Sequence, residues 1–499
     1  MAPMFTLPLT DLSPNANGLI SVQDQASRKM VRIFRREGTA WVITSNDHIF
    51  TTDQLSKGLQ LGIDARDTRR PGIWDGRVSV TFTVRDGTTV ATDTVNLRVA
   101  PIITHHHGQA TTRVFVTSGN DTETGNFFQA RFVRGLENAL NKTEANYPLY
   151  QFRGSDDIWA QDFFEPGYTS MPGPNGPITL RVMIRSAQDS RVAGRQVFEY
   201  LRDAETGAVQ HLGGERDDMN AMGNLETIPP YELNGKKYPA GRIVMGTHGK
   251  RVPHIVDYFR AQEIQEPILI NTNCLTIGHV DEMIQFLPVE SPRGWVMLAA
   301  DPLAAVDLLE DAVQNGHGSI RAFSRQNDTE GNPSDLFSII GGLKGVPSDS
   351  INELLNWEGI LDANTAIAKC TDENIKLLKD QTGITDAEII RVPVMFRTHF
   401  LIAPNNGYGP ERNDSSTMGV ALYPNPINGL VLNDHEIITA SPWGPIINGT
   451  DIVMSAVQNV YQKLGYTLSF VDNWNSLHTW GGEVHCGTNT IRDVQLHWY

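Results

Sequence analysis

Apolar and polar residues alternate along two neighbouring stretches in the first hundred residues. Residues 78–84 place an apolar side chain at every second position, and residues 95–99 repeat the pattern. This period of two is typical of strands with one buried face. Asp86-Gly87 lies between the two stretches and favours a tight turn, so we predict an antiparallel hairpin. No helical pattern precedes Ala100, and the region is predicted to be all-β.

Beyond residue 101 the pattern changes to interleaved helices and strands. Apolar residues recur every four positions from 128 to 140, which predicts an amphipathic helix. Asp301 and Pro302 are a good N-cap and first residue for a helix over 303–313, and a third helical zone is predicted over 350–378. Short apolar runs near these helices predict strands at residues 180–184, 268–270, 283–287 and 431–432.

A boundary between the two regions is predicted near Pro101 and the segment His105-His106-His107-Gly108. Three adjacent histidines cannot all converge on one metal ion, so a solvated linker is favoured over a metal site here. We therefore predict an all-β domain over residues 1–101 and a large α/β unit with mixed β pairing over residues 102–499.

The charge of the chain narrows the classes of partner. The 499 residues include 57 Asp and Glu but 41 Lys and Arg, a formal net charge of −16. An excess of this sign disfavours binding to nucleic acid and to anionic membranes. No run of about 18 apolar residues predicts a membrane span. The first residues lack the features of a secretory signal, which favours a cytoplasmic protein and leaves secretion open.

One polar segment suggests proton-transfer chemistry. If residues 277–283 are extended, a period of two places His279 and Asp281 on the same face. A histidine beside an aspartate can position a proton donor and a carboxylate that binds charge. On this segment alone, a mutually satisfied His–Asp pair in a loop is the favoured interpretation.

The three cysteines differ in their surroundings. Cys274, Cys370 and Cys486 are far apart and allow at most one intramolecular disulfide. Cys370 lies in a helical apolar pattern and is predicted to pack in the core. Cys486 lies between His485 and Gly487 in a stretch without periodicity. Such a thiol is a candidate nucleophile if nearby positive charge makes it a thiolate, and an inert loop cysteine is an equal alternative.

Four motifs follow one another along the chain: Trp159-x-Gln-Asp162, Gly223-Asn-Leu-Glu226, Gly278-His-Val-Asp-Glu282 and Gly482-Glu-Val-His-Cys-Gly-Thr-Asn489. Together they resemble the catalytic domain of the protein-arginine deiminases (peptidylarginine deiminases) over roughly residues 100–499. Residues 93–101 resemble the end of the immunoglobulin-like domain that precedes it. The resemblance implies a five-bladed α/β propeller of the pentein type, built from ββαβ units, after an immunoglobulin-like β-sandwich.

The resemblance implies hydrolysis of peptidyl-arginine to citrulline and ammonia, with arginine-containing proteins or peptides as partners. A guanidinium stays protonated and must be bound as a cation, for which two carboxylates can clamp its N–H groups. By motif position these are Asp162 and Asp281. The Cys486 thiolate would attack the central carbon. His279 would protonate departing ammonia and then activate water against the covalent thiouronium intermediate.

Substrate contacts and metal ligands follow from the same resemblance. Trp159 would line the methylene stem of the substrate arginine, with plain packing as its alternative role. Arg191 would hydrogen-bond the substrate backbone, with a solvated surface position as its alternative. Trp480 stands where some members place a second substrate-contacting arginine. One calcium ion near the active site is implied, with oxygen ligands from Gln161, Glu165, Met222, Leu225 and Glu226.

A second calcium site is predicted to be lost, because Phe163 and Arg185 stand where the family has carboxylates. Calcium independence is an alternative. Three other functions compete with a peptidyl-arginine deiminase: an agmatine or free-arginine deiminase on the same fold, a catalytically dead calcium-binding or adhesion module, and a papain-like hydrolase. The last leaves the two aspartates unexplained.

Overall fold

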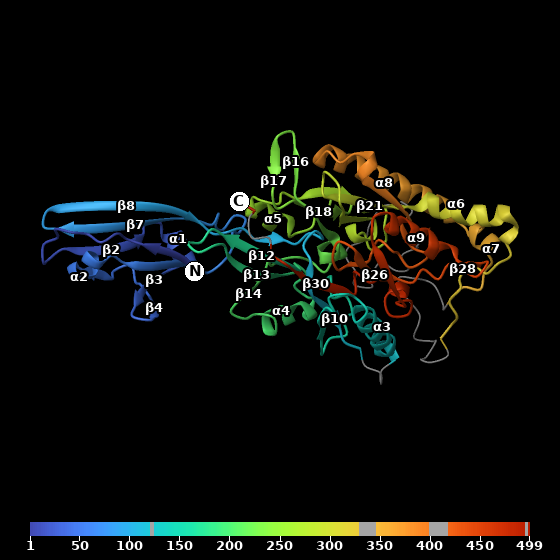
Figure 1. Ribbon diagram of the computed structural model, residues 1–499, viewed down its shortest axis with the longest axis horizontal. Coiled ribbons are helices and arrows are strands. Elements are labelled where there is room, and N and C mark those ends of the chain that lie inside the picture. The colour runs from blue at the N-terminus through green and yellow to red at the C-terminus, as the bar shows by residue number, and fades with distance from the viewer. Residues whose placement is uncertain (120–123, 329–345, 399–417, 495–497) are drawn as a thin grey trace.

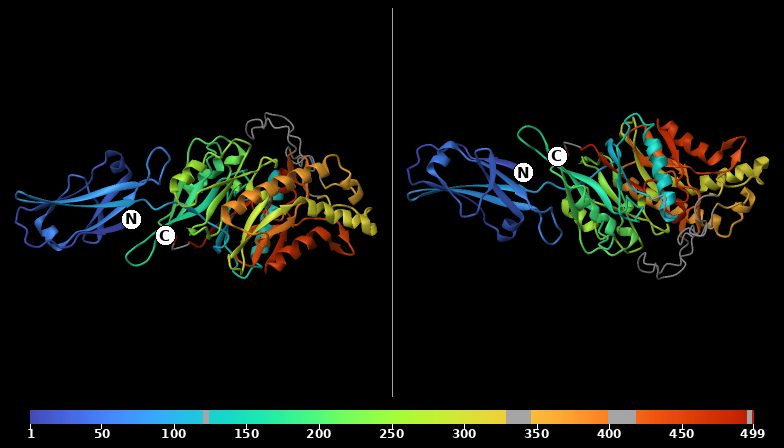
Figure 2. Two further views of the ribbon diagram at one scale, coloured as in Figure 1. Left: turned by 90° about the horizontal axis from the view of Figure 1, so that it is seen from above. Right: turned by 90° about the horizontal axis from the view of Figure 1, so that it is seen from below.

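The computed structural model describes residues 1–119, 124–328, 346–398, 418–494 and 498–499. Figure 1 shows an elongated molecule with strands β1–β8 at one end, and the two views of Figure 2 agree. Within the described residues, no helix combines the length and the apolar character needed to cross a membrane.

Two four-stranded antiparallel sheets form the N-terminal end of the molecule. Their strand orders are β1-β6-β3-β4 and β5-β2-β7-β8, and apolar residues of both sheets share one core. The strands are β1 (Ala2–Phe5), β2 (Asn17–Val22), β3 (Val31–Glu37), β4 (Ala40–Ile43), β5 (Ile49–Thr51), β6 (Gln60–Ala65), β7 (Arg77–Asp86) and β8 (Thr89–Arg98).

The predicted hairpin is confirmed, since β7 and β8 pair antiparallel from Arg77–Arg98 to Asp86–Thr89. The expectation of no helix in this region is wrong. Two six-residue helices occur, α1 (Gln25–Met30) and α2 (Thr52–Lys57), capped by Asp24 and Thr51. Six residues make fewer than two turns, which is too short for a helical period to stand out in the sequence.

The rest of the described chain contains five larger sheets with one pairing rule. In each, a central strand pairs antiparallel with one neighbour and parallel with the other. The sheets are β12 (Phe164–Met171), β13 (Ile178–Arg185) and β14 (Thr206–Gln210), extended by β9 (Ile103–Thr104); β15 (Leu225–Ile228), β18 (Arg242–Thr247) and β19 (Ile268–Asn271); β20 (Ile284–Pro288), β21 (Trp295–Asp301) and β22 (Ile389–Pro393); β25 (Leu430–Val431), β26 (Glu436–Ala440) and β29 (Thr467–Val471); and β30 (Thr488–Arg492), β10 (Thr111–Thr117) and β11 (Leu149–Phe152).

Helices connect the parallel strand pairs of these sheets. In chain order they are α3 (Thr124–Leu140), α4 (Gln196–Glu199), α5 (Val256–Gln262), α6 (Pro302–Ala312), α7 (Ile351–Leu355), α8 (Ile360–Thr382) and α9 (Ile452–Lys463). Three two-stranded ribbons complete the described strands: β16 (Tyr231–Leu233) with β17 (Lys236–Tyr238), β23 (Phe396–Thr398) with β24 (Gly419–Ala421), and β27 (Ile446–Ile447) with β28 (Thr450–Asp451). The predicted mixed α/β class is confirmed.

The C-terminal strand pairs with a strand from the start of the α/β region. β30 pairs antiparallel with β10, which lies almost four hundred residues earlier in the chain. The first and last parts of the α/β region therefore share one sheet, and the turn before β30, which carries Cys486, is held beside segments from the start of that region.

The cysteine pairing left open by the sequence is resolved. Cys274 and Cys370 form a disulfide, and Cys486 is the free cysteine. Cys370 lies on α8 in the apolar core, as predicted, but not as a thiol. The disulfide ties the loop before His279 to α8.

Candidate active site

Five turns meet at the candidate site, and each lies just before the strand that pairs antiparallel with the central strand of one of the five sheets. Asp162 precedes β12, Gly223 precedes β15, Asp281 precedes β20, Asn428 precedes β25 and Cys486 precedes β30. Segments separated by up to about three hundred residues in the chain thus contribute to one place because equivalent ends of the sheets point toward it.

The Cys486 thiol is buried and held by two polar neighbours. Its Sγ lies 3.2 Å from Asn428 Nδ2 and 3.6 Å from Asp281 Oδ2. The backbone N–H of Cys486 donates to Asn428 Oδ1 at 3.1 Å. Sequence reasoning missed Asn428. The available signal was a polar side chain in the segment Tyr423-Pro-Asn-Pro-Ile-Asn428, which is rich in proline and apolar residues.

Asp162, His279 and Asp281 converge around Gly223. A Cβ at position 223 would lie 2.7 Å from His279 Nδ1, 2.9 Å from Asp162 Oδ1 and 3.2 Å from Asp281 Oδ2. His279 Nδ1 is 3.9 Å from Asp162 Oδ1. Only a residue without a side chain leaves this space open, which explains glycine at position 223.

Three buried polar atoms at this place have no hydrogen-bond partner among the described residues. They are Asp162 Oδ1, His279 Nδ1 and Asp281 Oδ1. Buried polar atoms without a partner cost free energy and are rare in folded proteins. A ligand rich in N–H donors and positively charged would satisfy the two carboxylates, so the site suits a cation.

The local structure of the His279 segment differs from the extended conformation we predicted. His279 precedes a short 3-10 helix, Val280–Glu282, so the period-two argument is wrong. The helix forms because Glu282 Oε1 accepts hydrogen bonds from the backbone N–H groups of Gly278 and His279, at 3.0 and 2.8 Å. His279 Nε2 donates to the Asp218 carbonyl at 2.8 Å, which leaves Nδ1 facing the site.

Burial and negative charge set the protonation of the site. Burial, then Asp281 and Asp162, raise the pKa of the Cys486 thiol well above its usual value. Burial also raises the pKa of Asp162. Burial opposes protonation of His279, but Asp162 and Asp281 outweigh it and raise its pKa. The site therefore favours a neutral thiol beside a protonated imidazole until a further positive charge arrives.

Of the three predicted substrate contacts, Trp159 and Arg191 lie close to this centre. Trp159 is half-buried, and a Cβ at Gly482 would lie 2.4 Å from the Trp159 ring and 3.3 Å from Cys486 Cβ. Trp480 is also half-buried, at the end of a 3-10 turn. Arg191 is not a solvated surface residue, because its Nε is 2.7 Å from Asp157 and its Nη1 is 3.4 Å from Asp162, with 11% of its side chain exposed.

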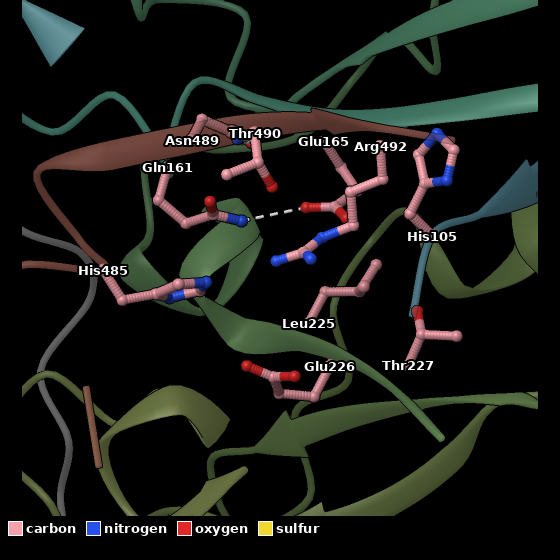
Figure 3. A pocket seen from close by; sticks show the side chains of 10 residues that line it. All are labelled: His105, Gln161, Glu165, Leu225, Glu226, Thr227, His485, Asn489, Thr490 and Arg492. Carbon is pink, nitrogen blue, oxygen red and sulfur yellow. Dashed lines mark hydrogen bonds between the residues drawn. The ribbon is translucent and has the colours of Figure 1, made fainter. Parts of the chain in front are cut away.

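A cavity of about 30 Å³ lies beside the site and is lined by four of the five predicted calcium ligands, namely Gln161, Glu165, Leu225 and Glu226. Figure 3 shows Glu165, Glu226 and Gln161 around it, together with His485 and Arg492. Burial raises the pKa of Glu165 and of Glu226 to about 8 each. Carboxylates destabilised in this way suit a hard divalent cation, which would favour their ionised form.

The remaining predicted calcium ligands fit with one adjustment. Met222 and Leu225 lie in the turn that leads into Glu226, so their carbonyl groups are within the same short segment. The Gln161 amide nitrogen donates to Glu165 at 2.9 Å, so this amide must turn to offer its oxygen. The donor set as a whole fits calcium.

Phe163 and Arg185 stand where the second calcium site was predicted to be lost, and the Arg185 side chain is held there by hydrogen bonds. Phe163 is fully buried, and Arg185 donates to Gln210 Oε1 at 2.8 Å and to the Arg191 carbonyl at 3.0 Å. Arg185 therefore supports the loop that carries Arg191.

The predicted solvated linker at residues 105–107 is wrong. His105, His106 and His107 are each at most 8% exposed. Their polarity suggested solvent contact, but this segment leads into β10 and is buried. His105 and His106 form hydrogen bonds with the nearby Gln109 and Gly108, whereas His107 contacts the distant Phe286 carbonyl.

Comparisons with known proteins agree with this picture. The family model described as protein-arginine deiminase (PAD) matches residues 89–499. The chain is 31% identical over 409 residues to protein-arginine deiminase type-4 of Rattus norvegicus, covering 80% of this chain and 55% of that protein. It is 31% identical over 414 residues to type-3 of Homo sapiens, covering 81% and 56%. Among solved structures, an agmatine deiminase of C. jejuni matches with a TM-score of 0.41 and 9% identity, covering 80% of this chain and 99% of that one.

The chain belongs to the protein-arginine deiminase family, as its motifs indicated. It spans about half the length of the curated relatives it matches.

Proposed function

We propose that this protein hydrolyses the guanidinium group of arginine residues in proteins or peptides, giving citrulline and ammonia. The observation that carries the proposal is the convergence of one buried thiol with two aspartates and a histidine, three of them with buried atoms that have no partner. Membership of the protein-arginine deiminase family supports it.

The substrate guanidinium would bind between Asp162 and Asp281. Its N–H groups match the unpartnered carboxylate oxygens Asp162 Oδ1 and Asp281 Oδ1, and charge-assisted bonds of this kind are about twice as strong as neutral ones. The added positive charge would also reverse the effect of the two aspartates on Cys486. Substrate binding would therefore help to create the thiolate that attacks it.

The chemical steps use Cys486 and His279. The thiolate attacks the central guanidinium carbon, and the imidazolium Nδ1 of His279 gives its proton to the departing nitrogen, which leaves as ammonia. The product is a covalent thiouronium. Neutral His279 then takes a proton from water, and the water oxygen attacks the same carbon. The adduct expels the thiolate and loses its hydroxyl proton to the released ammonia, which leaves citrulline and ammonium. Asn428, which donates to the sulfur, would orient the nucleophile.

Three residues would select the substrate. The Trp159 ring would line the methylene stem, and Trp480 would lie at the rim of the site. Arg191 would leave Asp162 when a substrate guanidinium takes that carboxylate, and it would then hydrogen-bond the peptide backbone. Its present contact with Asp162 is long, at 3.4 Å, and its bond to Asp157 would hold it nearby.

One calcium ion would bind Gln161, Glu165, Glu226 and the carbonyl groups of Met222 and Leu225. When bound, it would supply positive charge that keeps the two carboxylates ionised. Gln161 adjoins Asp162 in the chain, so calcium ligation would also fix the turn that presents Asp162.

The repeated sheets support a five-bladed α/β propeller over residues 102–499, with the site at its centre. Four sheets follow a ββαβ order along the chain, and in the fifth the C-terminal strand β30 takes the place of the first strand. Each sheet contributes the turn before its strand β12, β15, β20, β25 or β30. The two-sheet unit formed by β1–β8 would be an immunoglobulin-like domain over residues 1–101.

A colorimetric citrulline assay tests the proposed function. The protein should convert a blocked arginine amide faster than free arginine or agmatine, and a calcium chelator should lower the rate. Cys486→Ala should abolish citrulline formation without altering the unfolding temperature. Retained activity in Cys486→Ala would overturn the mechanism, and a preference for agmatine or free arginine would overturn the assigned substrate class.

A further inference from the structure

A group of three buried side chains beside the active site has ligand atoms that face one another. His107 follows β9, Glu226 lies on β15 and His485 precedes β30, yet their ligand atoms all lie within 4.8 Å of one another. Two imidazoles and one carboxylate differ from the oxygen-only donor set expected for calcium. Together with a free coordination position, such a set is typical of zinc and related transition metals.

Both histidines are already oriented as metal-binding histidines usually are. His107 Nδ1 is 3.0 Å from the Phe286 carbonyl, and His485 Nδ1 is 2.9 Å from Asp281 Oδ2. Each Nδ1 therefore donates to its oxygen partner, so the neutral form of each ring has its lone pair on Nε2. Hydrogen bonds of this kind to a carbonyl or carboxylate fix the tautomer and orientation of metal-ligating histidines in known metal sites.

We propose that His107, Glu226 and His485 bind one divalent transition-metal ion of the zinc type. An ion about 2.1 Å from three tetrahedrally placed atoms needs them roughly 3.4 Å apart, so side-chain shifts of up to about 1 Å would complete the site. The adjoining cavity of about 30 Å³ has room for a water molecule as a further ligand.

The charges around the group permit a divalent ion. Glu165 and Glu226 line the same cavity as Arg492, whose guanidinium donates to the carbonyls of Gln109 and Val431. Ionised Glu165 and Glu226 carry two negative charges against the one positive charge of Arg492, so a bound dication would change the net charge of this group from −1 to +1. Figure 3 shows the Arg492 guanidinium pointing into the space between His485 and Glu226.

The proposed site shares Glu226 with the proposed calcium site, whereas the remaining ligands differ. Zinc and calcium should therefore compete, and three variants should separate them. His107→Gln should weaken only zinc binding, Glu165→Gln only calcium binding, and Glu226→Gln both. The zinc site does not depend on the proposed catalytic function, because its ligands are tested by binding alone.

The test uses the full chain without a histidine tag, freed of metal by a chelator. During titration with Co²⁺, the visible d–d absorption should rise until one Co²⁺ ion is bound per chain. Added Zn²⁺ should displace the Co²⁺ and remove this absorption. His107→Gln should weaken Zn²⁺ binding by roughly 100-fold, since loss of even an outer partner costs about 10- to 100-fold. The matched control is His106→Gln, a neighbouring buried histidine outside the group, which should bind as the unaltered protein does.

Three results would overturn the proposal. They are no stoichiometric binding of Co²⁺ or Zn²⁺ by the unaltered chain, undiminished binding by His107→Gln, and an equal loss in His106→Gln. Circular dichroism checks that each variant is folded. If His107→Gln does not fold, Glu226→Gln decides: it should lose both metals, and zinc binding that survives in it contradicts the proposal.

Discussion

Replacing Gly223 by alanine tests the geometry of the site without removing any of its chemical groups. The new methyl group would lie 2.7 Å from His279 Nδ1 and 2.9 Å from Asp162 Oδ1. Relaxed contacts between such atoms are about 3.5 Å or longer, so one side must move by about 0.8 Å. Since both polar atoms are buried on separate turns, the shift would separate His279 from Asp162.

The expected losses in activity and stability have different sizes. A misplacement of about 1 Å in a catalytic geometry costs roughly 100-fold in rate, so kcat should fall by about that factor. Overpacking of a buried site costs about 1–3 kcal/mol, which should reduce the free energy of unfolding but leave the protein folded at 25 °C.

The assay is citrulline release from a blocked arginine amide, combined with urea unfolding to measure stability. Gly135→Ala is the matched control, because a Cβ there meets no atom within 4 Å and the position lies within α3. This control should retain full activity. Gly223→Ala with kcat within about threefold of the unaltered protein would refute the proposed convergence of Asp162 and His279 on the substrate.

Three further predictions follow from protonation and covalent structure. Asp162→Asn should lower the pKa of Cys486, measured from the pH dependence of alkylation by iodoacetamide, because Asp162 helps to raise it; an unchanged pKa contradicts this. Without calcium, Glu165 holds a proton up to about pH 8 in the folded state but releases it near pH 4.5 when unfolded, so the free energy of unfolding should fall as pH rises between these values. Glu165→Gln should flatten that fall in urea titrations, and an equal slope in both proteins is the contrary result. Cys370→Ser should lower the free energy of unfolding by about 2–4 kcal/mol, because the bond to Cys274 closes a loop of about a hundred residues. Dithiothreitol should then lower the free energy of unfolding of the unaltered protein but not that of the variant. An unaltered protein whose free energy of unfolding does not change in dithiothreitol would exclude a stabilising disulfide.

Local sequence patterns correctly predicted the elements that form from contacts between residues close together in the chain. The β7–β8 hairpin was readable because alternation and a turn signal lie within twenty-two residues. The helix α6 was readable from its Asp301 cap and Pro302 at its start. The three histidines at 105–107 misled the prediction, because their burial comes from packing against distant parts of the chain that no local pattern reveals, such as the Phe286 carbonyl beside His107.

The sequence predicted only those site residues that lie within the four motifs. The motif positions named Asp162, His279, Asp281 and Cys486, and the structure brings these residues together. Asn428 lay outside the four motifs and contacts Cys486 across fifty-eight residues of sequence. The conformation at His279 was also missed, because the hydrogen bonds of Glu282 to the backbone override the strand pattern.

The most direct test of the central claim is a crystal structure of the Cys486→Ala protein bound to a blocked arginine amide. The account predicts one guanidinium group with its N–H groups on Asp162 and Asp281 and its central carbon facing the β-carbon of residue 486. A guanidinium that binds elsewhere and contacts neither aspartate would contradict the account.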